Sequence, residues 1–66
     1  MTLMVNGEPK SLDEGTTVLT LLEALGVAEE RVAVEVNRRL VRRATWSEAP
    51  LAEGDVVEIV QFVGGG

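Results

Sequence analysis

The sequence predicts a single α+β domain in which one main helix packs on one face of a mixed sheet of four to five strands. Two observations support this prediction. Short apolar segments with a two-residue period recur along the chain, and a helical period occurs only once, between them. A hairpin followed by one helix and further strands is typical of a helix covering one sheet face. With 66 residues, the chain can build one small core.

The first element expected is a hairpin near the N-terminus. Residues 2–5 are short, apolar and partly β-branched, as in a strand, and residues 8–12 read as the returning strand. Asn6-Gly7 lies between them, and this pair is the strongest signal for a two-residue turn because both positions need positive φ. Pro9 lacks a backbone donor, so its nitrogen should face away from the partner strand.

The main helix is expected after a turn at residues 13–15. Four apolar residues recur at helical spacing and form one stripe: Val18, Leu21, Leu22 and Leu25. Thr17 suits the N-cap, and Gly26 suits the left-handed position after the last helical residue. Leu19 lies off the stripe, where we prefer packing under the first hairpin to a partner contact.

A second hairpin is expected after a polar connection at residues 27–31. Residues 32–37 alternate between apolar and polar side chains, which predicts a half-buried strand, and a turn at Asn37-Arg38 leads into a short strand at residues 39–41. Four arginines gather here: Arg38, Arg39, Arg42 and Arg43. They are interpreted either as a solvated turn that offsets acidic neighbours or as a docking patch for an acidic region of a partner.

An irregular segment follows at residues 44–53. Trp46 is expected to cover one edge of the core with its N–H bonded to backbone or water, and a ligand-stacking role is the alternative. Leu51 should reach into the core from this loop. Glu53-Gly54-Asp55 reads as a tight turn in which Gly54 supplies the positive φ.

Residues 56–62 are expected to form the last strand. Its alternation directs Val57 and Ile59 to the core and Glu58 to solvent. If this strand lies beside the first one, it runs parallel to it in the middle of the sheet. A central position would account for its nearly continuous apolar run.

Several apolar residues of this last segment are left on the outer face of the sheet. Exposed apolar side chains beside a mobile tail are typical of a contact patch. We therefore expect partner binding at four residues: Val56, Val60, Phe62 and Val63. The alternative is that Phe62 folds back onto the domain.

Three glycines, Gly64, Gly65 and Gly66, close the sequence. Glycine has no side chain to bury and is costly to order, so these residues would add nothing to a core. We expect a domain at residues 1–63 and a flexible tail at residues 64–66, which reaches roughly 10 Å. Such an arm would place the Gly66 carboxylate inside another protein's active site; a frayed chain end is the alternative.

The amino-acid composition argues against several functional classes. The chain has no cysteine and no histidine, so it lacks thiol nucleophiles, the commonest general base and the commonest transition-metal ligand, and we expect no enzyme and no metal site. No apolar run approaches the ~20 residues of a membrane span, and we expect a cytoplasmic protein. The net charge of −5 argues against nucleic-acid binding and favours partners with a basic docking surface.

One combined pattern runs through the whole chain. It comprises Val5-Asn6-Gly7-Glu8-Pro9, Thr17-Val18, Leu21-Leu22-Glu23, Leu25-Gly26, Val32-Ala33-Val34-Glu35-Val36-Asn37, Trp46, Glu53-Gly54-Asp55, Val57-Glu58-Ile59-Val60 and Gly65-Gly66. This pattern resembles the sulfur carrier family of thiamine biosynthesis, the ThiS family, whose fold is the ubiquitin-like β-grasp. One departure is Val41-Arg42-Arg43, where family members often carry Val-Pro-Arg.

The resemblance implies a carrier cycle centred on Gly66, with Gly64 and Gly65 threading the arm into partner enzymes. A ThiF-like adenylyltransferase would use ATP-Mg to convert the Gly66 carboxylate to an acyl adenylate. A sulfur donor, either a cysteine desulfurase or a rhodanese-type protein, would then replace AMP to give a C-terminal thiocarboxylate. A ThiG-like thiazole synthase would receive the sulfur. The carrier itself would bind no cofactor.

Proteins of other classes share a terminal Gly-Gly. The alternatives are the small subunit of molybdopterin synthase, a sulfur donor for tRNA thiolation, a ubiquitin-like modifier that joins lysines, and a structural module with a loose end. Co-purification with thiazole synthase would identify a carrier of thiamine biosynthesis, whereas co-purification with a molybdopterin synthase large subunit would identify the first alternative. Isopeptide-linked adducts in cells would identify a modifier.

Overall fold

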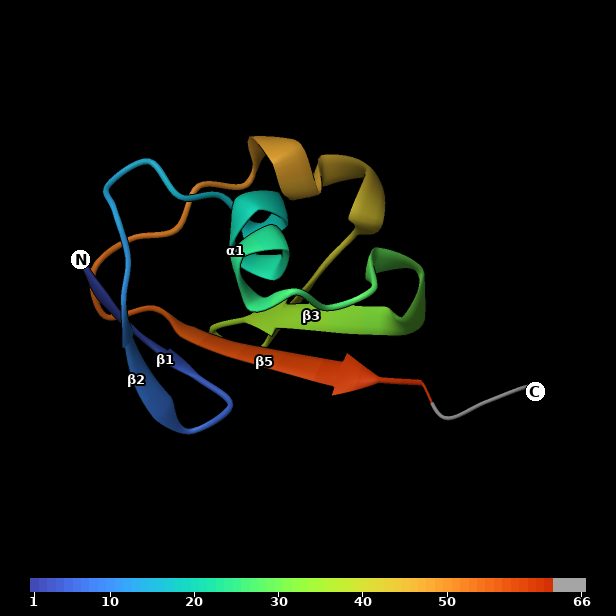
Figure 1. The fold of residues 1–66 in the computed structure, drawn as a ribbon, viewed down its shortest axis with the longest axis horizontal. Coiled ribbons are helices and arrows are strands. Elements are labelled where there is room, and N and C mark those ends of the chain that lie inside the picture. Colours follow the sequence, from blue (N-terminus) through green and yellow to red (C-terminus); the bar gives the residue numbers. More distant parts are fainter. Residues whose placement is uncertain (63–66) are drawn as a thin grey trace.

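A computed structural model describes residues 1–62 of the chain, so every expectation about residues 63–66 lies outside the described residues. The expected α+β architecture is confirmed, with one α-helix in the described part and a five-stranded mixed sheet (Figure 1). In chain order the elements are β1 (Thr2–Val5), β2 (Glu8–Ser11), α1 (Val18–Leu25), the 3₁₀ helix η1 (Glu29–Arg31), β3 (Val32–Val36), β4 (Arg39–Val41), the 3₁₀ helix η2 (Arg43–Glu48) and β5 (Val56–Gln61).

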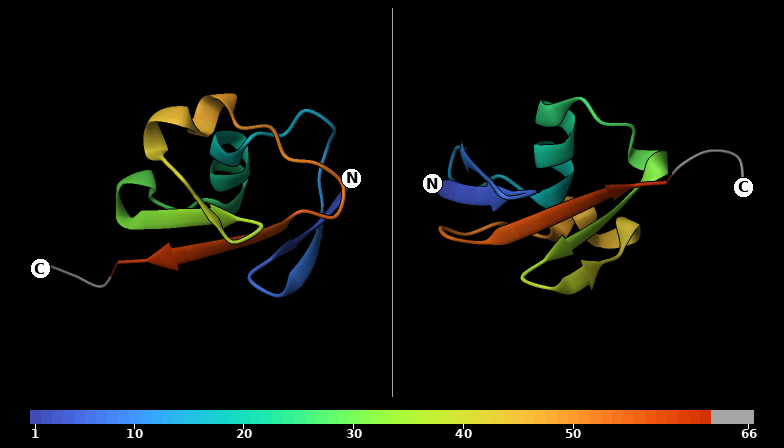
Figure 2. Two further views of the ribbon diagram at one scale, coloured as in Figure 1. Left: turned by 180° about the vertical axis from the view of Figure 1, so that it is seen from behind. Right: turned by 90° about the horizontal axis from the view of Figure 1, so that it is seen from below.

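The strands are arranged in the order β2-β1-β5-β3-β4, which places the last strand at the centre of the sheet. β5 runs parallel to β1 and antiparallel to β3, and both outer pairs are antiparallel hairpins. The predicted central, parallel placement of β5 is therefore confirmed. Figure 2 shows from two further sides that α1 and η2 lie on the same side of the sheet.

Both hairpins turn through two residues with positive φ. Asn6 and Gly7 have φ of 51° and 82°, and Asn37 and Arg38 have φ of 52° and 69°. Two-residue loops with this geometry match the right-handed twist of the strands they connect. The first loop has glycine at its second position, whereas the second loop has an arginine there.

Helix α1 begins and ends where the sequence predicts. The Thr17 hydroxyl accepts a hydrogen bond from the Thr20 N–H at 3.2 Å, and Gly26 has a φ of 72° after the last turn. The buried stripe is shorter than expected, because the buried core does not reach the last helical residue, Leu25, which is exposed. Leu19 is partly buried against the core, as expected. Among residues 1–62 no helix is long and apolar enough to cross a membrane.

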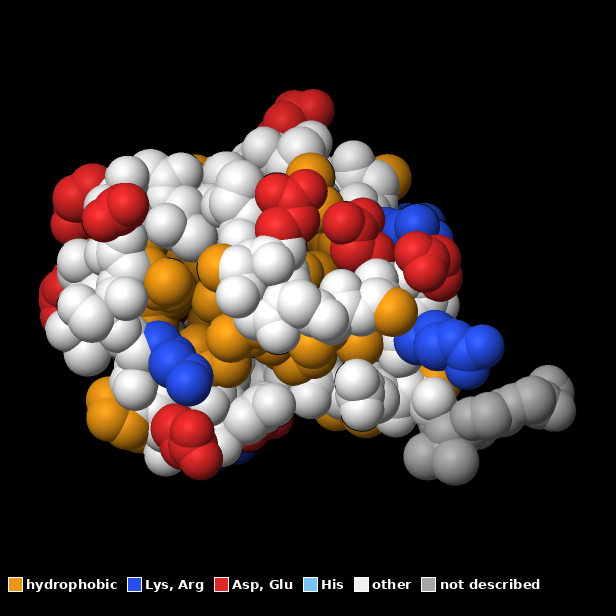
Figure 3. Space-filling model, viewed as in Figure 1, with side chains coloured by type: hydrophobic (Ala, Val, Ile, Leu, Met, Phe, Trp, Pro, Cys, Tyr) orange, Lys and Arg blue, Asp and Glu red, His pale blue; other side chains and the backbone are white. Residues whose placement is uncertain are grey.

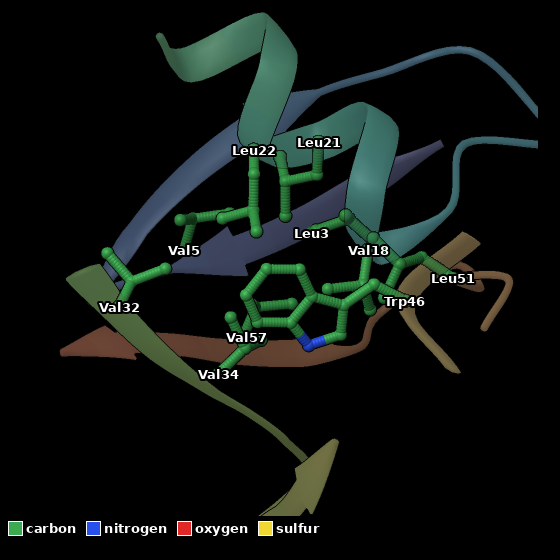
Figure 4. Packing of buried hydrophobic residues seen from close by; sticks show 10 residues of the cluster. All are labelled: Leu3, Val5, Val18, Leu21, Leu22, Val32, Val34, Trp46, Leu51 and Val57. Atoms are coloured by element: carbon green, nitrogen blue, oxygen red, sulfur yellow. The ribbon is translucent and has the colours of Figure 1, made fainter. Parts of the chain in front are cut away.

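The core lies between α1, η2 and one face of the sheet. Figure 4 shows the side chains that fill it, which come from every layer of the fold: Leu3, Val5, Val18, Leu21, Leu22, Val32, Val34, Trp46, Leu51 and Val57. The indole N–H of Trp46 donates to the Val41 carbonyl at 2.8 Å. Since Trp46 is buried, the structure confirms the core-covering interpretation and leaves no free ring face for stacking a ligand.

Candidate functional site

The candidate site is the outer face of the sheet together with the end of β5, where the chain leaves the fold. Five residue pairs join β5 to β3, from Val32–Gln61 to Val36–Val57. The Phe62 N–H then donates to the Arg31 carbonyl at 2.8 Å. The chain is therefore held by backbone hydrogen bonds as far as Phe62, the last described residue.

Asn6 holds β5 from the other side. Its side-chain oxygen accepts from the Ile59 N–H at 2.8 Å, and its side-chain nitrogen donates to the Ile59 carbonyl at 3.3 Å. The amide thus bonds β5 beyond the last β1–β5 residue pair, Val5–Val57. The sequence indicated the turn conformation of Asn6, but not these long-range bonds.

Asn37 performs the same function where β5 begins. Its backbone N–H donates to the Val56 carbonyl at 2.7 Å, and its side-chain oxygen accepts from the Val56 N–H at 3.0 Å. Its side-chain nitrogen donates to the Asp55 carboxylate, also at 3.0 Å. Two asparagines in hairpin turns therefore fix the central strand near its start and near its end.

Exposed apolar side chains lie along β5 and just beyond it. The exposed fractions are 44% for Val56, 58% for Val60 and 59% for Phe62. In Figure 1 the helix covers one side of the sheet, and no element covers the other side. Phe62 does not fold back onto the domain, so that alternative is wrong. The fourth predicted contact residue, Val63, and the three glycines lie outside the described residues.

The same outer face carries a pair of opposed carboxylates. Glu35 and Glu58 are direct partners in the β3–β5 register, and together with Arg38 and Val56 they line an open hollow. Like charges directly opposite each other on neighbouring strands are destabilising, and Arg38, which lines the same hollow, places a positive charge beside them. Sequence analysis directed Glu58 to solvent but missed this pair, because one strand's alternation does not fix its register with another.

Two further features of residues 1–62 concern metal ligands and buried polar side chains. No group of three or more acidic side chains in this part of the chain is placed to hold a metal ion. The described core contains no buried polar or charged residue.

Comparisons with known proteins find one family and relatives of similar length. The profile of the ThiS family matches residues 3–66. The sulfur carrier protein ThiS of Thermus thermophilus is 42% identical over 62 residues, covering 94% of this chain and 95% of that protein. A crystal structure of the thiamine biosynthesis protein ThiS from Geobacter metallireducens superimposes with a TM-score of 0.86 at 42% identity and covers both chains completely.

A second kind of relative is much longer. A thiazole synthase of Magnetococcus marinus is 47% identical over 66 residues, which is all of this chain but only 20% of that protein. The chain therefore spans about a fifth of the length of this relative.

Proposed function

The chain belongs to the ThiS family, and from this membership we propose that it is a sulfur carrier of thiamine biosynthesis whose reacting group is the Gly66 carboxylate. The observation that supports this proposal most strongly is the likeness, over nearly the full length of both chains, to one protein named as the sulfur carrier ThiS and to another named as the thiamine biosynthesis protein ThiS. Partner enzymes would bind the folded domain and would carry out the chemistry at Gly66.

The chemistry explains why a partner must activate the carrier. A free α-carboxylate is ionised at neutral pH and is a poor electrophile. In the proposed cycle an adenylyltransferase uses ATP-Mg to form an acyl adenylate at Gly66, releasing pyrophosphate. The outer sulfur of a persulfide on a cysteine desulfurase or a rhodanese-type protein then displaces AMP and forms an acyl disulfide. A second thiol cleaves the S–S bond by exchange and becomes part of a new disulfide, and the thiocarboxylate that is released donates its sulfur to thiazole synthase.

Thiazole synthase is the partner for which a relative offers support. One polypeptide named as a thiazole synthase contains a segment that matches this entire chain. Because a carrier and its acceptor must meet for sulfur transfer, a single polypeptide that carries both parts is consistent with their acting together. The remaining partners follow from the proposed chemistry alone.

The outer face of β5 is the proposed docking site for these enzymes. Val56, Val60 and Phe62 are exposed on or beside the strand that leads into the glycine segment, so a partner bound there would hold the chain close to its own active site. Val63, Gly64 and Gly65 would continue this contact into the partner, where a narrow channel accepts residues without a β-carbon.

The experiment that tests this function is an ATP–pyrophosphate exchange assay with the activating enzyme of the same organism. The wild-type chain should support exchange. Gly65→Ala and Gly66→Ala should sharply lower it, because each adds a β-carbon and restricts the dihedral angles of the arm. Their unfolding midpoints should stay at the wild-type value, since the paired strand β5 ends at Gln61. Exchange at the wild-type rate in both variants would contradict the proposal.

A further inference from the structure

The β3–β4 hairpin has a charge opposite to that of the rest of the molecule. Arg38 lies in its turn and Arg39 in β4, and Arg42 and Arg43 follow directly at the start of η2. All four, named here the arginine hairpin, are exposed. The rest of the chain contains eleven acidic residues and only two basic ones. Within residues 1–62 none of the four guanidinium groups forms a salt bridge or hydrogen bond with another residue. None of the four is therefore paired with a carboxylate of residues 1–62, and Arg38 lines the same hollow as Glu35 and Glu58.

Arg38 occupies a backbone position at which glycine would be more stable. Its φ of 69° lies in the left-handed region, at the second position of a two-residue hairpin loop. In the first hairpin of the same chain, that position is taken by Gly7 with a φ of 82°. Side chains other than glycine pay a steric cost in this conformation, and such strain is retained mainly where the side chain has a function.

The hairpin is held rigidly on the folded body. Asn37 bonds to Val56 and Asp55 at the start of β5, as described above. At the end of β4, the Val41 carbonyl accepts from the indole N–H of the buried Trp46 at 2.8 Å. A charged surface on a fixed backbone loses little conformational freedom when it binds.

The composition of the hairpin fits a protein surface better than a nucleic acid. Leu40 is 66% exposed between the arginines, and exposed apolar side chains combined with arginine are typical of protein interfaces. Single-stranded nucleic acids bind where aromatic side chains stack with bases, but the nearby Trp46 is buried. The net charge of −5 also opposes binding to polyanions.

We propose that the arginine hairpin is a second docking surface that binds an acidic patch on a partner enzyme and sets the orientation in which the carrier docks. This inference rests on the proposed function, because the partner is an enzyme that receives the carrier. Because the hairpin and the rest of the molecule have opposite charges, the field of the partner enzyme orients the carrier as the two proteins approach. Complementary charge patches act mainly on the association rate.

Two substitutions at one position separate docking from stability. Arg38→Gln removes the charge and keeps the strained backbone, whereas Arg38→Gly removes both. Each should weaken binding to the activating enzyme or to thiazole synthase of the same organism about two- to fivefold, mostly through slower association at low salt. Only Arg38→Gly should also raise the unfolding midpoint, by about 2–5 °C. Binding is measured with a surface biosensor at low and high salt, using the full chain.

The triple variant R38Q/R39Q/R42Q should weaken binding about tenfold or more, as the losses at several exposed charges accumulate. Lys10→Gln is the matched control, since it removes one exposed positive charge from β2 on the opposite edge of the sheet. It should bind like the wild type.

The proposal would be overturned if all arginine variants bound both enzymes like the wild type, if Lys10→Gln lost as much affinity, or if the wild type bound neither enzyme. Sedimentation in which the wild type dimerises and the triple variant does not, with enzyme binding unchanged, would assign the hairpin to a second copy of the chain instead. Sulfur loading at Gly66 separates the two proposals. Loading with unimpaired binding of the variants rejects only the hairpin, and hairpin-dependent binding without loading rejects only the carrier function.

Discussion

Single side chains complete the hydrogen bonding of the central strand where backbone pairing stops. Asn6 and Asn37 each occupy a left-handed turn position and each bond to β5 through their side chains. Sequence reasoning identified both residues as turn formers, because asparagine tolerates positive φ. It could not identify the second role, since the partner of Asn6 lies 53 residues further along the chain.

Replacing Asn6 with glycine tests this second role without changing the turn. Asn6→Gly keeps the left-handed conformation but loses both bonds to Ile59, so the free energy of unfolding should fall by about 1–2 kcal/mol. Asn6→Asp keeps the acceptor for the Ile59 N–H but sets a second carboxylate oxygen against the Ile59 carbonyl, so it should also be destabilising. Urea denaturation measures both. Equal stability of Asn6→Gly and the wild type would show that the two bonds contribute nothing.

At the scale of elements, the sequence predicts features that depend on neighbouring residues better than features that depend on residues far away in the chain. Local signals predicted the first turn, the N-cap Thr17 and the C-terminal Gly26, because each depends on neighbours a few residues away. Leu25 was misplaced in the buried stripe, since helical spacing says nothing about where the core ends. The Glu35–Glu58 pair was missed because strand register is set by tertiary packing.

The part of the candidate site on β5 was predicted because it depends only on alternation. Strand β5 directs Val57 into the core, which leaves Val56 and Val60 on the opposite face. The charges beside them were found only in the structure, where Glu35 and Arg38 line the same hollow as Val56. The exposure of these apolar residues was therefore predictable, and their electrostatic surroundings were not.

Phe62 should contribute strongly to docking as the largest exposed apolar side chain next to the glycine segment. Phe62→Ala should weaken the complex with the activating enzyme by about 1–2 kcal/mol or more, because aromatic anchors dominate many interface energies. Leu25→Ala is the matched control, since Leu25 is an exposed apolar residue on the helix and not on the outer sheet face. Titration calorimetry that finds wild-type affinity for Phe62→Ala would remove this residue from the docking surface.

At the scale of the whole molecule, the described elements cover only one side of the sheet. The helix and the core occupy that side, and no element of residues 1–62 covers the other side (Figure 1). Figure 3 shows acidic side chains around the rim of the molecule, in keeping with its net charge of −5. The central strand connects the core with the exposed end of the fold, because β5 packs Val57 into the core and leads to the exposed Phe62.

The central claim is that Gly66 becomes a thiocarboxylate. Its most direct test is the intact mass of the full chain after incubation with the activating enzyme, ATP and a sulfur source, with the Thermus thermophilus sulfur carrier as a positive control for the assay. The account predicts an ATP-dependent species that is heavier by the difference between one sulfur and one oxygen atom, and no such species for the variant without Gly66. An unchanged mass in an assay that loads the control protein would contradict the account.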